Sequence, residues 1–441
     1  MGRALRTALL VCALAFALAA PAVATASAPA ITYGLSDAPG AFAHCVDDRF
    51  PCCDDPASVC LTGSVGGYYD NPAFQALTTP ASRHRIGQIR FFVDYDAVQE
   101  FNGSTTSPGC VYSRALLHGF YDAAGHWHPP GQSLNDLVAG LIEAGNDRLT
   151  PMVAIAGYES PTAKPAWDQP APDPTTPAGY WAYRCGLQGI LDAVSRLPPG
   201  DQPHIWEPFN EPDAAPMFNG PGRTGPGACD VSPAGGAGVD GAAKAACEYA
   251  IADDEIRHFA GHGADTVIAG TFARASVSYL AAYAAQLQST LPGAAFPATW
   301  SVHDYRDVTA SFGAPLLSGL EAFDEALRAD TGGAARALWI TEAGVELTDP
   351  AAFSGCAPAP GMPETLGACV DGQSTRQAVA AANFFALPEA GVAVPITHLF
   401  WYQWQGVPDW DSGILDPAGN PRAPWCAFFG SGVCDGSPDA A

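Results

Sequence analysis

Short apolar runs alternate with longer alanine-rich segments along most of the chain. The apolar runs are rich in β-branched and aromatic residues and end in polar or aromatic residues, which predicts strands. The longer segments between them have helical length and composition. We expect strands at residues 31–35, 89–95, 151–156, 204–209, 266–272, 299–303, 337–341 and 397–401. We expect helices at residues 134–144, 179–196, 242–261, 277–291, 315–329 and 375–387, with a poorly marked helix before the second strand.

This alternation of strands and helices is typical of parallel β/α units. Eight such units close most simply into a (β/α)8 TIM barrel, an α/β fold that tolerates elaborated loops. The main alternative is an open doubly wound sheet, but no glycine-rich phosphate turn follows the first strand. No repeat or linker-like stretch divides the chain, so we expect residues 27–441 to form a single (β/α)8 domain.

The first residues of the chain have the pattern of an export signal. Arg3 and Arg6 precede an apolar run over residues 8–20, and Ala24-Thr25-Ala26 offers a cleavage site between small residues. We therefore expect a signal peptide over residues 1–26 and a secreted, extracellular protein; a membrane anchor is the alternative. No later stretch reaches the ~18 apolar residues of a span, so stable membrane insertion is not expected.

The cysteines fit an oxidising compartment. The chain has 13 cysteines, and all but Cys12 lie beyond the predicted cleavage site. An even number in an exported chain predicts disulfides that staple long loops. Cys229–Cys247 and Cys356–Cys369 are the bridges we prefer, because each pair brackets a glycine- or proline-rich insertion. No C-x-x-C pair suggests a zinc site.

Composition narrows the class of ligand. The chain has 441 residues, of which 48% are hydrophobic, so a large core is possible and disorder is excluded. The formal net charge of −25 repels phosphate backbones, which makes nucleic acid an improbable partner. Anionic lipids and acidic polysaccharides are disfavoured for the same reason, and a neutral ligand is the easiest fit.

Two carboxylates stand at strand ends that face the same rim of the predicted barrel. Glu211 follows the fourth strand in Asn210-Glu211-Pro212, and Glu342 ends the seventh strand after Thr341. In such barrels chemistry occurs where strands end. Two facing carboxyl groups are what cleavage of a glycosidic bond needs, one to protonate the leaving oxygen and one to attack the anomeric carbon. A pair ~5–5.5 Å apart acts with retention of configuration.

Other strand-end residues can support this pair. Asn210 can bind a sugar hydroxyl, Tyr305 can hold Glu342 by a hydrogen bond, and Arg90 can keep a carboxylate ionised. Trp401 offers an aromatic floor for a pyranose ring. His303 is a direct sugar ligand or a structural hydrogen-bonding residue, and both interpretations stay open. Glu207, four residues before Glu211, is either a buried structural acid or an acid that holds the site residues in place, and we favour the second interpretation.

These motifs resemble those of clan A glycoside hydrolases, the group that includes families 5 and 39. The resemblance rests on Asn-Glu-Pro at strand four, His303-Asp304-Tyr305 at strand six, Thr-Glu at strand seven and a tryptophan at strand eight. It implies a retaining glycoside hydrolase, and together with the charge argument above it predicts a neutral oligo- or polysaccharide as substrate. It also implies that Glu211 is the acid/base and Glu342 the nucleophile. Asn210 would bind the sugar 2-hydroxyl, with His303 and Tyr305 as supports.

Two other functions remain open at this stage. A carbohydrate-binding barrel that has lost catalysis is the first, although such a protein usually lacks one carboxylate. A metal-dependent barrel hydrolase is the second, but His303 and Asp304 are too few ligands. His258 and His262 have metal-like spacing, yet Gly261 and Gly263 break the helix there, so we expect surface histidines. We expect no cofactor and no metal, and neither the sugar nor the oligomeric state is readable.

Overall fold

The structure, a computed structural model, describes residues 30–37, 72–94, 120–121, 127–128, 132–156, 174, 177–213, 237–274, 276–291, 295–309, 318–345, 372–389, 392–404, 412–415 and 422–430. Beyond residue 30, all of these lie in one compact unit, Ile31–Ala441. The predicted signal peptide, residues 1–26, lies outside the described residues, as do Cys45, Cys52, Cys53 and Cys60. No helix among the described residues is both long enough and apolar enough to span a bilayer.

The core of this unit is a 9-stranded sheet in which every pairing is parallel. Its strand order is β7-β6-β5-β2-β1-β11-β10-β9-β8. The two strands at the ends of this order, β7 (Thr266–Val267) and β8 (Ala269–Phe272), are consecutive in the chain and separated only by Ile268. They are two pieces of one strand, so the sheet returns to its start as a barrel of eight β/α units. The predicted (β/α)8 barrel is thereby confirmed, and the disulfide-stapled loops stay a prediction.

The remaining barrel strands are β1 (Thr32–Asp37), β2 (Ile86–Asp94), β5 (Thr150–Ala156), β6 (Ile205–Glu207), β9 (Thr299–His303), β10 (Ala337–Ala343) and β11 (Ile396–Tyr402). A separate antiparallel pair consists of β3 (Phe120–Tyr121) and β4 (Trp127–His128).

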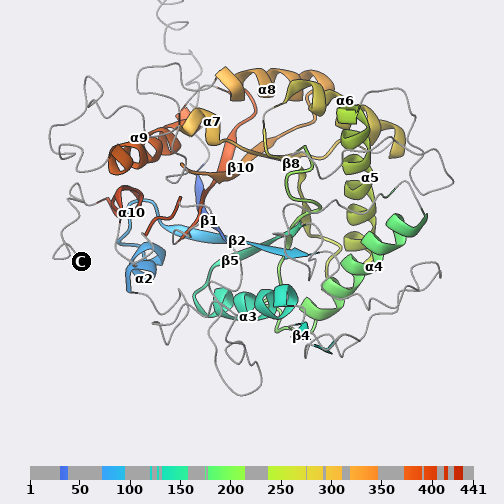
Figure 1. The fold of residues 1–441 in the computed structure, drawn as a ribbon, viewed down its shortest axis with the longest axis horizontal. Helices are drawn as coiled ribbons and strands as arrows, with labels where there is room; N and C mark the ends of the chain where they lie inside the picture. Colours follow the sequence, from blue (N-terminus) through green and yellow to red (C-terminus); the bar gives the residue numbers. More distant parts are fainter. Residues whose placement is uncertain are drawn as a thin grey trace, which may run out of the picture. The chain divides into compact units, whose positions relative to one another are not determined.

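Helices surround the strands, as the ribbon shows for α3, α4, α5, α6 and α8 (Figure 1). The helices are α2 (Pro72–Thr78), α3 (Gln132–Asn146), α4 (Pro177–Val194), α5 (Ala237–His258), α6 (Val277–Thr290), α7 (Tyr305–Val308), α8 (Ser318–Asp330), α9 (Gly372–Ala386) and α10 (Ala423–Phe429), with a short 3-10 turn at Leu387–Glu389. All six predicted helices are present within a few residues. The poorly marked helix before the second strand is α2, whereas α7 and α10 were not predicted.

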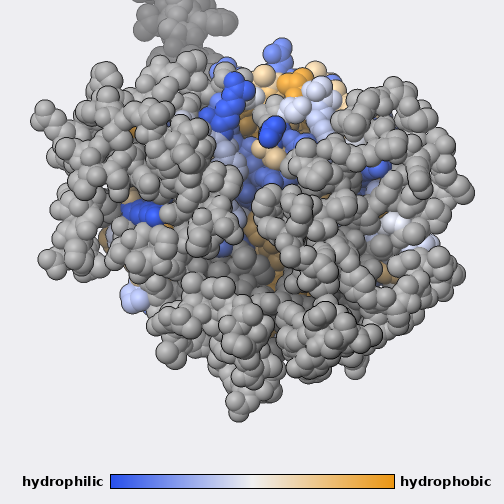
Figure 2. Space-filling model, viewed as in Figure 1, coloured by the Kyte–Doolittle hydropathy of each residue, from blue (hydrophilic) through white to orange (hydrophobic). Residues whose placement is uncertain are grey.

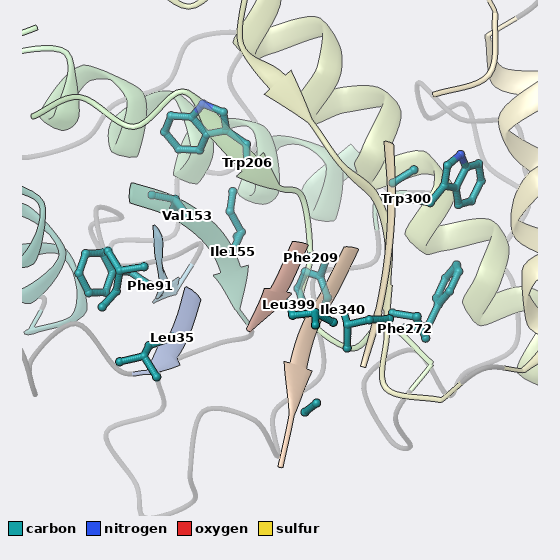
Figure 3. Close-up of a cluster of buried hydrophobic side chains, with 14 of the residues drawn as sticks. Leu35, Phe91, Val153, Ile155, Trp206, Phe209, Phe272, Trp300, Ile340 and Leu399 are labelled. Atoms are coloured by element: carbon teal, nitrogen blue, oxygen red, sulfur yellow. The ribbon is translucent and has the colours of Figure 1, made fainter. Parts of the chain in front are cut away.

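Two hydrophobic clusters lie on opposite sides of the barrel wall. The larger one combines strand residues with residues of the surrounding helices, and Figure 3 labels ten of its strand-side members, among them Leu35, Phe91 and Leu399. The smaller one is drawn from the strands and from the break between β7 and β8; its members are Met152, Ile268, Trp339 and Phe400, with Ile205 and Ala337 packed against them. This second cluster fills the inside of the barrel, as close packing of such folds requires.

Gly34 illustrates how tightly the inner cluster is packed. A Cβ atom on Gly34 would lie 2.4 Å from the ring of Phe400, so β1 has glycine where the Phe400 side chain fills the interior. Successive side chains of a strand point to opposite faces. Ser36 therefore faces the interior as Gly34 does, whereas Leu35 faces the helices. This alternation decides which strand-end residues reach the site.

Disulfide bonding is seen at three cysteines. Cys185, Cys247 and Cys426, the cysteines of the described ranges, are each disulfide-bonded. Cys229, the preferred partner of Cys247, lies outside those ranges, and so does the whole Cys356–Cys369 pair. The individual pairings and the loops that they close remain predictions.

Candidate active site

Register across the strands brings the polar residues of the site to one level of the barrel interior. Ser36 of β1 pairs with Arg90 of β2 on one side and with Tyr402 of β11 on the other. Residues paired across parallel strands project to the same face. Arg90 and Tyr402 therefore lie beside Ser36 on the inner face, next to the smaller hydrophobic cluster inside the barrel. In the space-filling view, hydrophilic residues are visible between the grey atoms near the middle of the face (Figure 2).

Arg90 is the hub of this level. Its side chain is fully buried, and its Nε lies 2.5 Å from Glu207 Oε2. Its Nη1 lies 2.5 Å from Glu342 Oε1 and 2.9 Å from Ser36 Oγ, and its Nη2 lies 2.6 Å from Asn210 Oδ1. The planar guanidinium thus donates in several fixed directions, which lysine cannot imitate. The predicted contact between Arg90 and Glu342 is present.

Glu207 explains how so deeply buried a cation is tolerated. Glu207 lies at the end of β6 with no exposed surface, and it forms one of the two ion pairs of Arg90. A buried charge is costly unless it is paired and hydrogen-bonded. Glu207 and Glu342 both form ion pairs with Arg90, at 2.5 Å each. The sequence interpretation of Glu207 as a supporting acid agrees with this position.

The turn after β6 places Asn210 and Glu211 at the mouth of the barrel. The Asn210 N–H donates to the carbonyl of Ile155, and the Glu211 N–H donates to the carbonyl of Thr271. Glu211 has a φ of 50°, in the left-handed region that non-glycine residues seldom occupy. Such a backbone costs of order 1–3 kcal/mol and persists where its surroundings fix it. Neighbouring strands thus hold the Glu211 backbone on both sides.

Glu211 and Glu342 meet at His303. His303 Nδ1 lies 2.7 Å from Glu211 Oε1 and 3.5 Å from Glu342 Oε2. One ligand-type atom of each of the three residues lies within 4.8 Å of the other two. The Glu211 side chain is 24% exposed, whereas that of Glu342 is 6% exposed and that of His303 is buried. The more open carboxylate is thus the one at the mouth.

The electrostatics of this trio favour a proton on His303. Burial lowers the pKa of His303, but the charge of Glu342 and the hydrogen bond to Glu211 raise it to a larger combined extent, so the pKa lies above its ordinary value. Burial raises the pKa of Glu211, but the hydrogen bond and charge of His303, with smaller contributions from Arg90 and Arg274, bring it below the ordinary value. The hydrogen-bonded pair therefore carries one proton.

Tyr305 holds the other side of Glu342. Its hydroxyl donates to Glu342 Oε2 over 2.8 Å, as the sequence predicted. Burial and the charge of Glu342 raise the pKa of Tyr305 well above its ordinary value, so it remains a donor. Tyr305 begins the short helix α7, whose N-cap Asp304 accepts the N–H of Asp307. Burial and the nearby charge of Asp307 raise the pKa of Asp304 to about 7.

Trp401 does not reach the site, and its predicted role as an aromatic floor is corrected by its position. Trp401 pairs with Leu35, faces the helices and has no exposed surface. Its ring packs edge-on against Phe384 of α9, and its N–H donates to the carbonyl of Ser412. The sequence prediction chose the wrong member of an alternating pair, because the adjacent Tyr402 is the residue that points inward.

Tyr402 and Phe92 are the aromatic residues that sequence reasoning missed. Their rings meet edge to face at 6.4 Å, and the Arg90 guanidinium lies 4.6 Å from the Phe92 ring centre. Burial, then the charges of Glu342 and Asp37, raise the pKa of Tyr402 well above its ordinary value, so its hydroxyl stays protonated. The signal was available in the sequence: Phe92 is two residues beyond Arg90 and therefore shares its face.

Two clusters of the described residues have metal-ligand chemistry. The first is Glu211, His303 and Glu342 itself. The second is His204, His262 and Asp265 at the opposite ends of the strands. In it each histidine Nδ1 lies at hydrogen-bond distance from Asp265, 2.7 Å for His204 and 2.6 Å for His262, and Trp206 also donates to Asp265. Contacts of this length indicate a hydrogen-bonded carboxylate. His262 is buried, so the expectation of a surface histidine was wrong.

Comparison with known proteins supports the fold. No family model and no curated protein matches the sequence. Among solved structures, the chain is similar to a family 5 xyloglucanase from Paenibacillus pabuli, with 14% identity, a TM-score of 0.50, and coverage of 90% of this chain and 96% of that chain. It is also similar to a family 5 lichenase from Caldicellulosiruptor sp. F32 in complex with cellotetraose, with 13% identity, a TM-score of 0.50, and coverage of 90% and 91%.

A GH39 β-xylosidase from Caulobacter crescentus aligns over 92% of this chain and 72% of that chain, with 14% identity and a TM-score of 0.48. The two solved structures with a TM-score of 0.50 are both family 5 glycoside hydrolases, one of the families that the sequence resemblance named. At these identities the likeness establishes the (β/α)8 barrel fold.

Proposed function

We propose that the chain is a retaining O-glycoside hydrolase, with Glu342 as nucleophile and Glu211 as general acid and base. One observation carries the proposal: carboxylate oxygens of Glu211 and Glu342 approach within 4.8 Å at the carboxyl ends of barrel strands. Inverting enzymes separate their carboxyl groups by ~6.5–9.5 Å to admit a water, and retaining enzymes by ~5–5.5 Å. The 4.8 Å limit applies to one oxygen of each carboxylate, and so close an approach supports the retaining geometry.

The proposed cycle consists of two displacements. In the first, a Glu342 oxygen forms a bond to the anomeric carbon while the bond to the leaving oxygen breaks. The leaving oxygen keeps the electron pair and receives the proton of the Glu211–His303 pair. In the second, a water oxygen attacks the anomeric carbon, its proton returns to the pair, and the Glu342 carboxylate departs with its electrons. Arg90 and Tyr305 hold Glu342 in line for both steps, and Asn210, fixed by Arg90, would bind the sugar 2-hydroxyl.

In this proposal, His303 holds the proton until Glu342 attacks and then passes it to Glu211. In the free protein the negative charge of Glu342 favours the proton on His303. When Glu342 attacks, its charge is consumed in the new ester bond, and the imidazolium loses its strongest support. The proton can then move along the 2.7 Å contact to Glu211, which delivers it to the leaving oxygen. This accounts for a general acid whose pKa is low before substrate binds.

The proposed substrate is a neutral oligo- or polysaccharide. The net charge of −25 disfavours acidic glycans. The chain shares its fold with a xyloglucanase and with a lichenase bound to cellotetraose. The names of both enzymes refer to carbohydrates, which agrees with such a substrate. We further propose that the protein is secreted after removal of residues 1–26 and that disulfides staple its loops. The disulfide-bonded state of Cys185, Cys247 and Cys426 supports this.

A substrate screen tests the proposed function. Purified mature protein is assayed on aryl glycosides and neutral polysaccharides, beside Glu342→Gln and Glu211→Gln, which keep side-chain size and remove the carboxylates. We expect hydrolysis by the wild type and a loss of at least about 10³-fold in Glu342→Gln. Saccharide binding without turnover would instead indicate the inactive carbohydrate-binding barrel. Activity abolished by a chelator and restored by a metal would indicate the metal-dependent alternative.

A further inference from the structure

The backbone that carries Glu211 is tied to an irregularity in the neighbouring strand. Between β8 and β9 the pairing shifts, with Gly270 opposite Ser301 and Phe272 opposite Val302. Thr271 is therefore the extra residue of a β-bulge. Its carbonyl accepts the Glu211 N–H at 3.0 Å, and its own φ of 58° is left-handed, like that of Glu211. Two strained residues thus meet through one hydrogen bond.

The bulge is itself held by a side chain. Because Thr271 falls between two ladder pairs, its N–H donates to the hydroxyl of Ser301 at 2.9 Å. The two hydroxyl groups, Thr271 Oγ1 and Ser301 Oγ, also share a hydrogen bond of 3.0 Å. Both residues have no exposed surface. Gly270 permits this close approach, since a Cβ there would lie 2.6 Å from the Ser301 carbonyl oxygen.

The contact between the two loops continues beyond Glu211. Asp213 accepts the N–H groups of Ala273 and Arg274, at 2.5 and 3.1 Å. The Tyr279 hydroxyl donates to the carbonyl of Pro212 at 2.8 Å. The segment that bears the proposed acid is therefore attached at three successive residues: Glu211 to Thr271 of β8, Pro212 to Tyr279 of α6, and Asp213 to the two residues that follow β8. Its position follows that of the bulge.

We infer that Ser301 is a positioning residue for Glu211, acting through the Thr271 bulge. The inference rests on the proposed glycosidase function and adds to it a residue that touches neither carboxylate. Without the Ser301 hydroxyl, the Thr271 N–H is left buried without this acceptor, and an unsatisfied buried group is costly. The bulge then relaxes, and Glu211 loses the backbone contact that aims its carboxyl group at the leaving oxygen.

Leaving-group dependence separates this role from a merely structural one. Proton delivery matters most when the leaving group is poor, so a displaced acid slows a phenyl glycoside and spares a 2,4-dinitrophenyl glycoside. In Ser301→Ala we expect kcat/KM to fall by roughly 10–100-fold on the phenyl glycoside and by less than about threefold on the dinitrophenyl one. Both glycosides carry the sugar that the wild type hydrolyses best.

Two further variants guard against loss of folding. Ser82→Ala is the matched control, because Ser82 is another buried serine, and its hydroxyl donates to the carbonyl of Phe428 away from the site. It should slow both substrates equally or not at all. Thr271→Gly keeps the backbone groups and relieves the left-handed strain, but it removes the hydroxyl that bonds to Ser301 and frees the bulge, so it should show the same selective loss as Ser301→Ala.

The outcomes are separable. If the wild type hydrolyses glycosides but Ser301→Ala and Thr271→Gly slow both leaving groups equally, or neither, the positioning role is wrong and the proposed function stands. If the wild type hydrolyses no glycoside, the proposed function is wrong and the positioning role is rejected with it. Selective loss on the phenyl glycoside in both variants, with Ser82→Ala unaffected, establishes the inference.

Discussion

His303 Nδ1 and Glu211 Oε1 lie 2.7 Å apart at the mouth of the barrel, and the two groups share one proton. Burial opposes the charge on each, but the attraction between them and the charge of Glu342 raise the pKa of His303 and lower that of Glu211. The pair binds a second proton only at a pH below the ordinary pKa of a glutamate. It loses the shared proton only at a pH above the ordinary pKa of a histidine.

This pair predicts the alkaline limb of the pH–activity profile. Activity requires the shared proton, so kcat/KM should fall only above the ordinary histidine pKa of about 6.5. In His303→Asn the proton must reside on Glu211 alone, and the alkaline limb should move to lower pH. The measurement is kcat/KM against pH for both proteins. An unchanged alkaline limb in the variant would show that His303 takes no part in holding the proton.

The ion pair between Arg90 and Glu207 predicts that a second substitution can restore the stability of an Arg90 variant without restoring its activity. Arg90→Met leaves Glu207 buried without its cation, which should lower the free energy of unfolding by roughly 3–5 kcal/mol. Adding Glu207→Gln removes the uncompensated charge, so the double variant should regain part of that stability. Activity should stay low in both, because Glu342 and Asn210 have lost their common donor. Urea unfolding and kcat/KM are measured on the same preparations.

If the double variant is no more stable than Arg90→Met, Glu207 is not the main counter-charge of Arg90. If the double variant regains activity, Arg90 is dispensable for holding Glu342.

The alternation on β11 predicts opposite phenotypes for adjacent aromatic residues. Trp401→Phe removes a buried N–H that donates to Ser412, so stability should fall by about 1–2 kcal/mol while kcat/KM stays within about twofold. Tyr402→Ala should lower kcat/KM at least about tenfold, because Tyr402 lies on the inner face at the level of Ser36 and Arg90 and its ring packs against Phe92. Kinetics and thermal unfolding of the two variants provide the comparison. A larger kinetic loss in Trp401→Phe than in Tyr402→Ala would reverse the assignment of the two faces.

Asp304 predicts a stability that declines as pH rises. Burial and the charge of Asp307 raise its pKa from 3.8 to about 7 in the folded protein. The folded state therefore binds this proton more tightly than the unfolded state, and the stabilisation is complete below about 4 and lost as pH rises through 7. Asp304→Asn keeps an N-cap oxygen and has no charge to bury.

The variant should gain stability relative to the wild type between pH 4 and pH 8, by at most about 4 kcal/mol. Melting temperatures of both proteins across this range measure the difference. A difference that does not change with pH would mean that Asp304 titrates normally.

Much of the barrel could be predicted because burial on both faces leaves a strong sequence signal in parallel strands. Strand β9 was predicted with its observed ends, Thr299–His303. Strand β6 is shorter than predicted, Ile205–Glu207, because the chain turns at Pro208 to aim Asn210 and Glu211. The break at Ile268 and the bulge at Thr271 depend on pairing with distant strands, and no local pattern marks them.

The sequence identifies a site residue where its chemical type and its position at a strand end are enough. It fails where the face of the strand decides, because that face depends on the register with the neighbouring strand. Arg90, Asn210, Glu211, His303, Tyr305 and Glu342 do converge. Tryptophan suits sugar stacking, so its residue type points to Trp401, but the orientation of Trp401 depends on the register of β11 against β1. The burial of His262 likewise comes from the fold, since Asp265 and Trp206 close around it after β6 and β7 pair.

The most direct test of the account is product stereochemistry by proton NMR, for the wild type and for Glu211→Ala and Glu342→Ala with added azide. Glu342 is proposed to form the covalent intermediate, so the wild type should release a product of retained configuration. Glu211→Ala should accumulate the intermediate from an activated aryl glycoside and give the azide with retained configuration. Glu342→Ala should give the inverted azide. An inverted wild-type product, or azide products with the two configurations exchanged, would contradict the assignment of these glutamates.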